Sequence, residues 1–229
     1  MSGFAVAYAN LMYDIFFLSH NEPLAELHWQ KLLAQHPHAR RPEPVDGILD
    51  AHRRCAQLSR TSHFFVVDAD NEILEVDFRL KLSDYDQGYV HIWRAKNPVN
   101  GLVYGWGGVK LFPKKLLLNR DTMPLDMTTS FPLKIVNVIG SITHFNMTSF
   151  DTWRSAFREA VKLSCSQDIE ARERLEVWCT VANGSYAEWC LKGAQAGRMY
   201  AIDHRDDQEA LMKINDWNWL KERFDGKEA

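Results

Sequence analysis

The sequence predicts an α/β fold, a single domain with a Rossmann-like mixed sheet and a helical C-terminal section, on three observations. Strand-like apolar runs alternate with amphipathic helical patterns over the first third of the chain. Residues 64–67 are all apolar, as in a strand buried on both faces of a sheet. The last third keeps a helical period. We expect one domain over residues 1–229, with one half at about 12–82 and a more helical half at about 83–229.

The pattern of the first half predicts alternating strands and helices. The expected elements are a strand at 13–19, a helix to residue 35, an irregular strand at 39–45, a helix at 48–58 and a strand at 64–67. Asn21-Glu-Pro is a helix-start signal, and Pro42 and Pro44 make the second strand an edge or an irregular piece. The order predicts parallel strands joined by right-handed crossovers.

The second half reads as strands followed by helices. We expect strands at 75–82, 89–94, 109–112 and 135–139, turns at 97–101 and 113–115, a long polar loop at 119–131, and helices at 152–163, 185–196 and 207–224. A loop of this length is often a lid or a binding loop.

The composition excludes several classes of protein. A formal net charge of −3 over 229 residues gives no overall attraction for nucleic acid. The four cysteines have neither a Cys-x-x-Cys pair nor a zinc spacing, which indicates free thiols in a reducing compartment. Residues 1–18 have no basic segment of a signal peptide, and no apolar run reaches the ~20 residues that span a bilayer. We expect a cytoplasmic protein with no membrane partner.

Two carboxylates directly follow the apolar strand, at Asp68 and Asp70. In open α/β sheets, ligands bind at the carboxyl ends of the strands. Hard oxygen ligands there suit Mg²⁺ or Mn²⁺, which neutralise a diphosphate. A polar turn is the alternative, because Asn71 follows and Asp and Asn both favour turns.

The arrangement resembles the A-type glycosyltransferase fold. The matching segments are Phe17-Leu-Ser-His-Asn-Glu, Val45-Asp-Gly, Val66-Val-Asp-Ala-Asp and Tyr104-Gly-Trp-Gly-Gly. The runs Tyr13-Asp-Ile-Phe-Phe, Gly107-Gly-Val-Lys-Leu and Thr152-Trp-Arg-Ser are similar to glycosyltransferase-like proteins of large tailed bacteriophages. The resemblance covers roughly residues 12–200. It implies a nucleotide-binding half at about 12–82 and, for a phage protein, the host cytoplasm.

The resemblance also implies a donor site and a metal. The partner is a nucleotide sugar, and a divalent cation, Mn²⁺ or Mg²⁺, stabilises the departing diphosphate. The implied donor contacts are Ser19, Asn21, Asp46, Arg53 and Asp68, and the implied metal ligands are Asp68, Asp70 and His144. A helix N-cap turn is the alternative at 19–21 and a solvated helix face at Arg53. For His144 the alternative is an ordinary loop or core histidine.

Trp106, Gly107 and Gly108 are candidate acceptor contacts. Glycine lets a backbone approach a sugar closely, and the indole can stack on a ring. A hairpin or a bulge is the alternative. Val109-Lys110 stands where several inverting families have acidic residues, so Asp126 is the candidate catalytic base. A retaining mechanism stays open.

Arg154, Arg158 and Lys162 form a basic row at helical spacing. With the phage resemblance, the row predicts binding of DNA phosphates and hydroxymethylated DNA bases as the acceptor. A solvated helix face is the alternative. Two other functions stay open: a nucleotidyltransferase or pyrophosphorylase, and a non-catalytic phage binding protein on the same fold. The sequence does not determine the oligomeric state.

Overall fold

The computed structural model describes residues 12–122 and 124–226. Most of residues 1–18, in which we expected no signal peptide, therefore lie outside the described residues. In these residues a seven-stranded mixed sheet has the order β1-β2-β6-β4-β7-β3, with β5 paired to β4. The strands are β1 (Asp14–Leu18), β2 (His63–Asp68), β3 (Asn71–Ile73), β4 (Val90–Lys96), β5 (Val103–Tyr104), β6 (Val109–Pro113) and β7 (Leu133–Thr143). β1 pairs parallel with β2, and β4 parallel with β7. The predicted mixed α/β class is confirmed.

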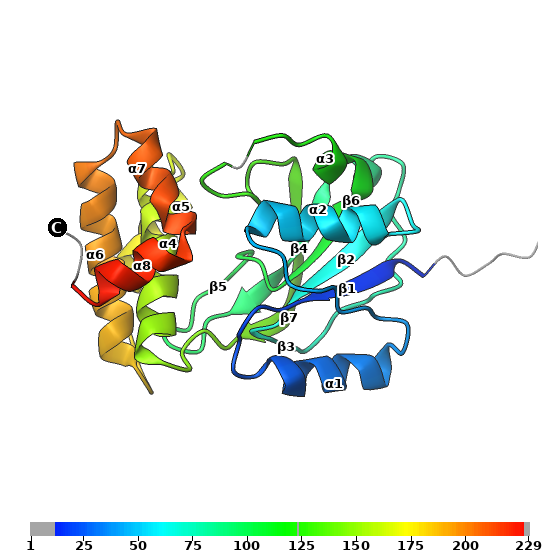
Figure 1. Cartoon of the computed structure of the whole chain (residues 1–229), viewed down its shortest axis with the longest axis horizontal. Coiled ribbons are helices and arrows are strands. Elements are labelled where there is room, and N and C mark those ends of the chain that lie inside the picture. Colours follow the sequence, from blue (N-terminus) through cyan, green and yellow to red (C-terminus); the bar gives the residue numbers. More distant parts are fainter. Residues whose placement is uncertain (1–11, 123, 227–229) are drawn as a thin grey trace, which may run out of the picture.

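Helices cover both faces of the sheet (Figure 1). They are α1 (Ala25–Gln35) on one face, and α2 (Ile48–Leu58) and α3 (Lys114–Leu118) on the other. Side chains of β2 alternate between the two layers: Phe65 and Val67 pack on the α1 side, Phe64 and Val66 on the α2 side. All four are fully buried, each contributing about 1.5–3 kcal/mol. The apolar run at 64–67 is therefore a strand buried on both faces, as predicted.

The last third forms a helical section beside the carboxyl ends of β1 and β2 (Figure 1). Its helices are α4 (Ser149–Cys165), α5 (Ile169–Thr180), α6 (Ala187–Asp203), α7 (Gln208–Met212) and α8 (Trp217–Phe224). The side chain of Thr148 caps α4 by accepting a hydrogen bond from the amide of Asp151 at 3.0 Å. Within the described ranges no helix is long and apolar enough to cross a membrane.

α6 packs on α4 at very close range through two glycines. A Cβ atom at Gly193 would lie 2.3 Å from the carbonyl oxygen of Trp153, and one at Gly197 would lie 2.3 Å from that of Phe157. The glycines are four residues apart, so they share one face of α6. The backbone of α6 can therefore approach α4 only because these positions lack a side chain.

The local predictions differ from the structure in several places, and the helix expected at 207–224 is interrupted, since it consists of α7, a 3-10 turn at Lys213–Asn215 and α8. Residues 39–45 form the predicted irregular piece rather than a strand: they contribute one isolated parallel bridge between Phe16 and Arg40, because Pro42 and Pro44 have no amide hydrogen to donate. Residues 75–82 pair with no strand; their apolar side chains pack on the core from a loop, and the strand is β3 instead. The expected turn at 113–115 is the start of α3, and α5 was not predicted at all.

Candidate functional site

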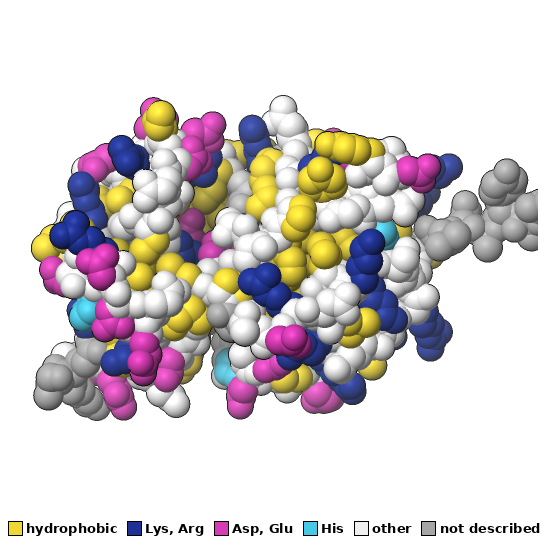
Figure 2. Space-filling model, turned by 90° about the horizontal axis from the view of Figure 1, so that it is seen from above, with side chains coloured by type: hydrophobic (Ala, Val, Ile, Leu, Met, Phe, Trp, Pro, Cys, Tyr) yellow, Lys and Arg dark blue, Asp and Glu magenta, His cyan; other side chains and the backbone are white. Residues whose placement is uncertain are grey.

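A cleft of about 780 Å³ separates the sheet from the helical section. Figure 2 shows acidic and basic side chains in the hollow between the two parts. On the sheet side the lining comes from the loop after β1, the segment before α2 and the residues that follow β2. The opposite wall is α4 with the chain before α8. Ligand clefts of roughly 300–1,000 Å³ hold small molecules, so this one has room for a nucleotide.

Most of the predicted site residues line this cleft. They are Ser19, Asp46, Asp68, Asp70, Trp106, Gly107, Gly108, Asp126, Arg154 and Arg158. They come from segments separated by more than a hundred residues, which the fold brings to one place. Asn21, Arg53 and His144 do not line it.

Asp68 closes β2 and forms an ion pair with Lys110 on β6. The Lys110 Nζ lies 2.7 Å from Asp68 Oδ2. The antiparallel register pairs Val66 with Lys110, so the lysine lies near the end of β2, and its side chain is only 3% exposed. Gly107, at φ 116°, leaves space for the lysine, since a Cβ there would lie 3.1 Å from Lys110 Cε. No local pattern in the sequence predicts this ion pair.

Replacing Lys110 with Met should lower the free energy of unfolding by about 2 kcal/mol. Losing one partner of a buried ion pair costs ~3–5 kcal/mol, and the partial exposure of Asp68 reduces that cost. Chemical denaturation measures the effect, with Lys192→Met, at a side chain 53% exposed on α6, as the control. If the Lys110 variant were as stable as the control, the ion pair between Lys110 and Asp68 would not contribute to stability.

Asp70 lies two residues past Asp68 and is held by a buried amide network. Asn71 Nδ2 donates to Asp70 Oδ1 at 2.6 Å. The amide oxygen of Asn71 accepts from Ser141 Oγ at 2.9 Å and from Thr143 Oγ1 at 2.7 Å, which fixes the orientation of the amide. Gly108 is required here, because a Cβ at that position would lie 1.9 Å from Asn71 Oδ1.

The surroundings of Asp70 disfavour its negative charge. Burial, with the nearby charges of Asp68 and Glu22, raises the pKa of Asp70 to about 7, although Arg154 and Asn71 oppose the shift. A cation bound beside Asp70 would therefore stabilise its ionised form. Glu22, which also lines the cleft, was not among the predicted site residues.

His144 does not join the two aspartates. Thr143 and Phe145 line the cleft, and His144 between them points elsewhere, as successive residues of an extended chain do. The His144 Nε2 atom lies 3.1 Å from Glu72 Oε2, and Glu72 also binds Lys31. In the described part of the chain no cluster of three or more His, Cys, Asp or Glu side chains has the geometry of a metal site.

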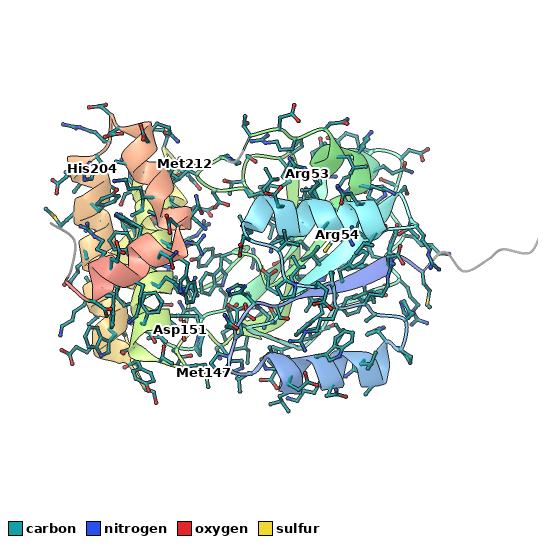
Figure 3. The ribbon with its side chains drawn as sticks, in the orientation of Figure 1. Arg53, Arg54, Met147, Asp151, His204 and Met212 are labelled. Atoms are coloured by element: carbon teal, nitrogen blue, oxygen red, sulfur yellow. The ribbon has the colours of Figure 1, made fainter. Side chains whose placement is uncertain are left out.

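Arg53 and Asn21 also lie outside the cleft. Arg53 extends from α2 (Figure 3), bonding to the carboxylate of Asp50 and the carbonyl oxygen of Arg120. It thus ties α2 to the chain after α3. Ser19, by contrast, does line the cleft, and its hydroxyl accepts a hydrogen bond from Arg41 Nε at 2.8 Å.

The helical wall carries two arginines one turn apart on α4. The guanidinium of Arg154 lies 4.4 Å from the ring centroid of Trp217, and its nearest ion-pair distance, to Asp151, is 4.0 Å. Arg158 Nη2 donates to Asn215 Oδ1 at 3.1 Å. Both Nε atoms are buried without a hydrogen-bond partner. Burial lowers the pKa of Arg154, and burial together with the charge of Arg154 lowers the pKa of Arg158 to about 10, so Arg158 stays charged at neutral pH.

Asp126 lies in the predicted loop, close to the basic row. Its Oδ1 accepts from the amide of Thr128 at 3.0 Å, and its Oδ2 lies 3.7 Å from Lys162 Nζ. Burial favours a higher pKa for Asp126, but Lys162, the amides of Thr128 and Thr129, and Arg158 outweigh it and hold the pKa below its usual value. Asp126 is therefore ionised at neutral pH, but it is a weaker base than an ordinary carboxylate.

Trp106 belongs to an aromatic cluster at the junction with the helical section. Its ring centroid lies 5.6 Å from that of Tyr104 in a stacked pair and 5.5 Å from that of Trp178. Tyr104 donates to Glu159 Oε1 at 2.7 Å and accepts from Trp178 Nε1 at 3.0 Å. The indole thus has a packing role as well as a place on the cleft wall. This buried network was not predicted.

No protein-family model matches the chain, and no curated protein matches it. Among solved structures, the crystal structure of HddC from Yersinia pseudotuberculosis is similar over 58% of this chain and 91% of that chain, with 13% sequence identity and a TM-score of 0.32. A likeness at this level carries no argument about activity.

Proposed function

We propose that the protein is a glycosyltransferase that moves a sugar from a nucleotide diphosphate donor to an acceptor hydroxyl, with Mn²⁺ or Mg²⁺ as cofactor. One observation carries the proposal: Asp68 ends and Asp70 follows the buried strand β2, which is parallel to β1, and both carboxylates line a cleft of nucleotide size. Ligands of open α/β sheets bind at that edge. The resemblance of the Asp-x-Asp segment to A-type glycosyltransferases gives the reaction class.

The residues present fit a divalent cation that is shared with a diphosphate. Lys110 occupies one oxygen of Asp68, and a carboxylate has a second oxygen to offer. The raised pKa of Asp70 marks a carboxylate whose charge a cation would compensate. Mg²⁺ is commonly held by one or two carboxylates, with substrate phosphates and water completing its shell. Asp68 and Asp70 would hold the cation, which supplies Lewis-acid stabilisation of the leaving diphosphate. His144 is not needed for this arrangement.

The remaining roles follow from position in the cleft. Ser19 and Asp46, at the sheet edge, would contact the nucleoside, with Ser19 already oriented by Arg41. Gly107 and Gly108 line the cleft and are the proposed acceptor contacts, but Lys110 and Asn71 fill the space that their side chains would take. For an inverting reaction, Asp126 is the cleft carboxylate proposed to take the acceptor proton, despite its lowered pKa.

Ligand-dependent stability tests the proposal. Nucleoside diphosphates should raise the melting temperature of the protein, and Mn²⁺ should increase that shift, because a ligand that binds only the folded state stabilises it. Incubation with nucleotide sugars should then release nucleoside diphosphate. Release of pyrophosphate from a nucleoside triphosphate and a sugar phosphate would instead indicate a nucleotidyltransferase. No nucleotide binding, with or without metal, would leave a binding protein on this fold.

Hydroxymethylated DNA stays a proposed acceptor. The basic row on α4 suggested this acceptor, with a solvated helix face as the alternative interpretation. The row is not such a face, because Arg154, Arg158 and Lys162 all line the cleft. A duplex backbone contacts basic side chains that extend from an outer surface. A DNA acceptor would therefore have to present a base inside the cleft, as enzymes acting on flipped bases require.

A further inference from the structure

The two arginines of α4 have more hydrogen-bonding capacity than the protein uses. A guanidinium has five N–H donors. Arg158 makes one side-chain hydrogen bond, to Asn215, and no carboxylate oxygen in the described residues lies within ion-pair distance of it. Arg154 has only the 4.0 Å approach to Asp151. Both Nε atoms are buried with no partner.

Unpaired buried charge is costly unless something pairs with it. Burying a charged group without a partner costs several kcal/mol, which is why such groups are normally matched. Asp70 and Glu22 attract Arg154 from across the cleft, and Asp126 and Glu159 attract Arg158, but none makes a direct ion pair with them. The wall therefore presents two fixed positive groups: Arg154, whose only ion pair is the 4.0 Å contact with Asp151, and Arg158, which has no direct ion pair in the described residues.

The geometry of the pair suits a planar or tetrahedral oxyanion. Residues four apart on a helix are neighbours on one face. Trp217 lies under the guanidinium of Arg154, and Asn215 holds Arg158, so both side chains are restrained before any ligand arrives. Guanidinium groups bind phosphate through paired, charge-assisted hydrogen bonds.

We propose that Arg154 and Arg158 form a subsite for a phosphate group that binds without a metal ion, on the wall opposite Asp68 and Asp70. The subsite deepens the proposed function and rests on it for the identity of the ligand. The phosphate belongs either to the leaving nucleoside diphosphate or to a small phosphorylated acceptor. The pair lines the wall of a cleft of about 780 Å³ rather than an outer surface, which favours a small ligand over a DNA backbone.

The first test measures binding of inorganic phosphate and pyrophosphate in the presence of a chelator, by calorimetry against chloride at equal ionic strength. Wild-type protein should bind both anions. Arg158→Gln and Arg154→Gln should each weaken binding about tenfold or more, the usual size of a charge-assisted hydrogen bond. Arg172→Gln, which removes an exposed arginine of α5 that does not line the cleft, should bind as the wild type does.

A second variant keeps the test valid if Arg158→Gln fails to fold. Arg158→Lys retains the charge and loses the paired donors, so it should fold and still bind phosphate more weakly than wild type. The proposal would be overturned if the wild-type protein bound neither phosphate nor pyrophosphate. It would also be overturned if the arginine variants bound these anions as well as Arg172→Gln does. Duplex DNA binding that depends on both arginines, without phosphate binding, would also overturn it in favour of a DNA surface.

Further arms identify the source of the phosphate. If the arginine variants lose affinity for a nucleoside diphosphate but not for the nucleoside, the subsite holds the donor. If the arginine variants lose affinity for inorganic phosphate but still bind the nucleoside diphosphate as the wild type does, the subsite holds the phosphate of the acceptor. These measurements are made without metal, so the subsite can be confirmed even if Mn²⁺-dependent release of nucleoside diphosphate from nucleotide sugars, which the proposed function requires, is not found.

Discussion

Asp70→Asn should reduce sugar transfer to background while leaving the protein folded. An amide oxygen carries no charge and binds a hard cation poorly, so the variant loses one of the two carboxylates proposed to hold the metal. It should lose the Mn²⁺-dependent part of the melting shift given by a nucleoside diphosphate. The amide oxygen can still accept the hydrogen bond from Asn71, now 2.6 Å from Asp70 Oδ1, so the local network should persist.

The same variant should be more stable than wild type at alkaline pH. The pKa of Asp70 is raised in the folded protein to about 7, above its value of about 4 in the unfolded chain. The folded state therefore binds the proton more tightly, and the stability linked to that proton is present below pH 4 and lost as pH rises through 7. Asparagine does not ionise, so at pH 8 and without metal the free energy of unfolding of the variant should exceed that of the wild type by about 1–3 kcal/mol. This range is smaller than the full pKa shift implies, because Asp70 borders the open cleft and its charge is partly screened by solvent. At pH 4 the gain should vanish.

Activity assays and denaturation at the two pH values check both effects. Asp206→Asn, at a side chain that is 97% exposed, is the control and should change neither activity nor stability. Transfer at the wild-type rate in the Asp70 variant would remove the proposed metal site. Equal stability of variant and wild type at pH 8 would show that Asp70 ionises without cost in the folded protein.

Gly197→Ala should destabilise the helical section by about 2 kcal/mol. In an exposed helix this change gains ~1 kcal/mol, because alanine is the better helix former. Here the new Cβ would lie 2.3 Å from the carbonyl oxygen of Phe157, and the obstacle is backbone of α4, which cannot rotate away. Overpacking of this kind costs ~3 kcal/mol and exceeds the gain in propensity. The same reasoning applies to Gly193 and the carbonyl of Trp153.

Chemical denaturation measures the loss, with Met199→Ala as the control. Met199 is on the same helix and is 55% exposed, so its replacement should change stability by less than about 0.5 kcal/mol. Because α4 forms one wall of the cleft, Gly197→Ala should also weaken nucleotide binding if α4 moves. An alanine variant more stable than wild type would mean that α6 does not pack on α4 as closely as described.

Elements with strong local signals could be predicted from the residues alone. The apolar run at 64–67 predicts a strand buried on both faces, and the carboxylates after it predict an acidic sheet edge, because strand burial and strand ends are read from neighbouring residues. The helical period similarly predicts α2 and α4, which the structure confirms. The candidate residues on these elements, Asp68, Asp70, Arg154 and Arg158, all line the cleft.

Which side chains contact one another depends on how distant segments fold together. Lys110 reaches Asp68 because the antiparallel register of β2 and β6 sets them together, and a register between strands forty residues apart leaves no local trace. His144 is one residue from the cleft-lining Thr143, yet strand alternation turns it to Glu72. Residues 75–82 have a strand-like pattern but no partner strand, because backbone pairing depends on what the rest of the fold places beside them. Local sequence fixes which residues stand at the ends of elements, whereas charge pairing and metal geometry depend on contacts between distant segments.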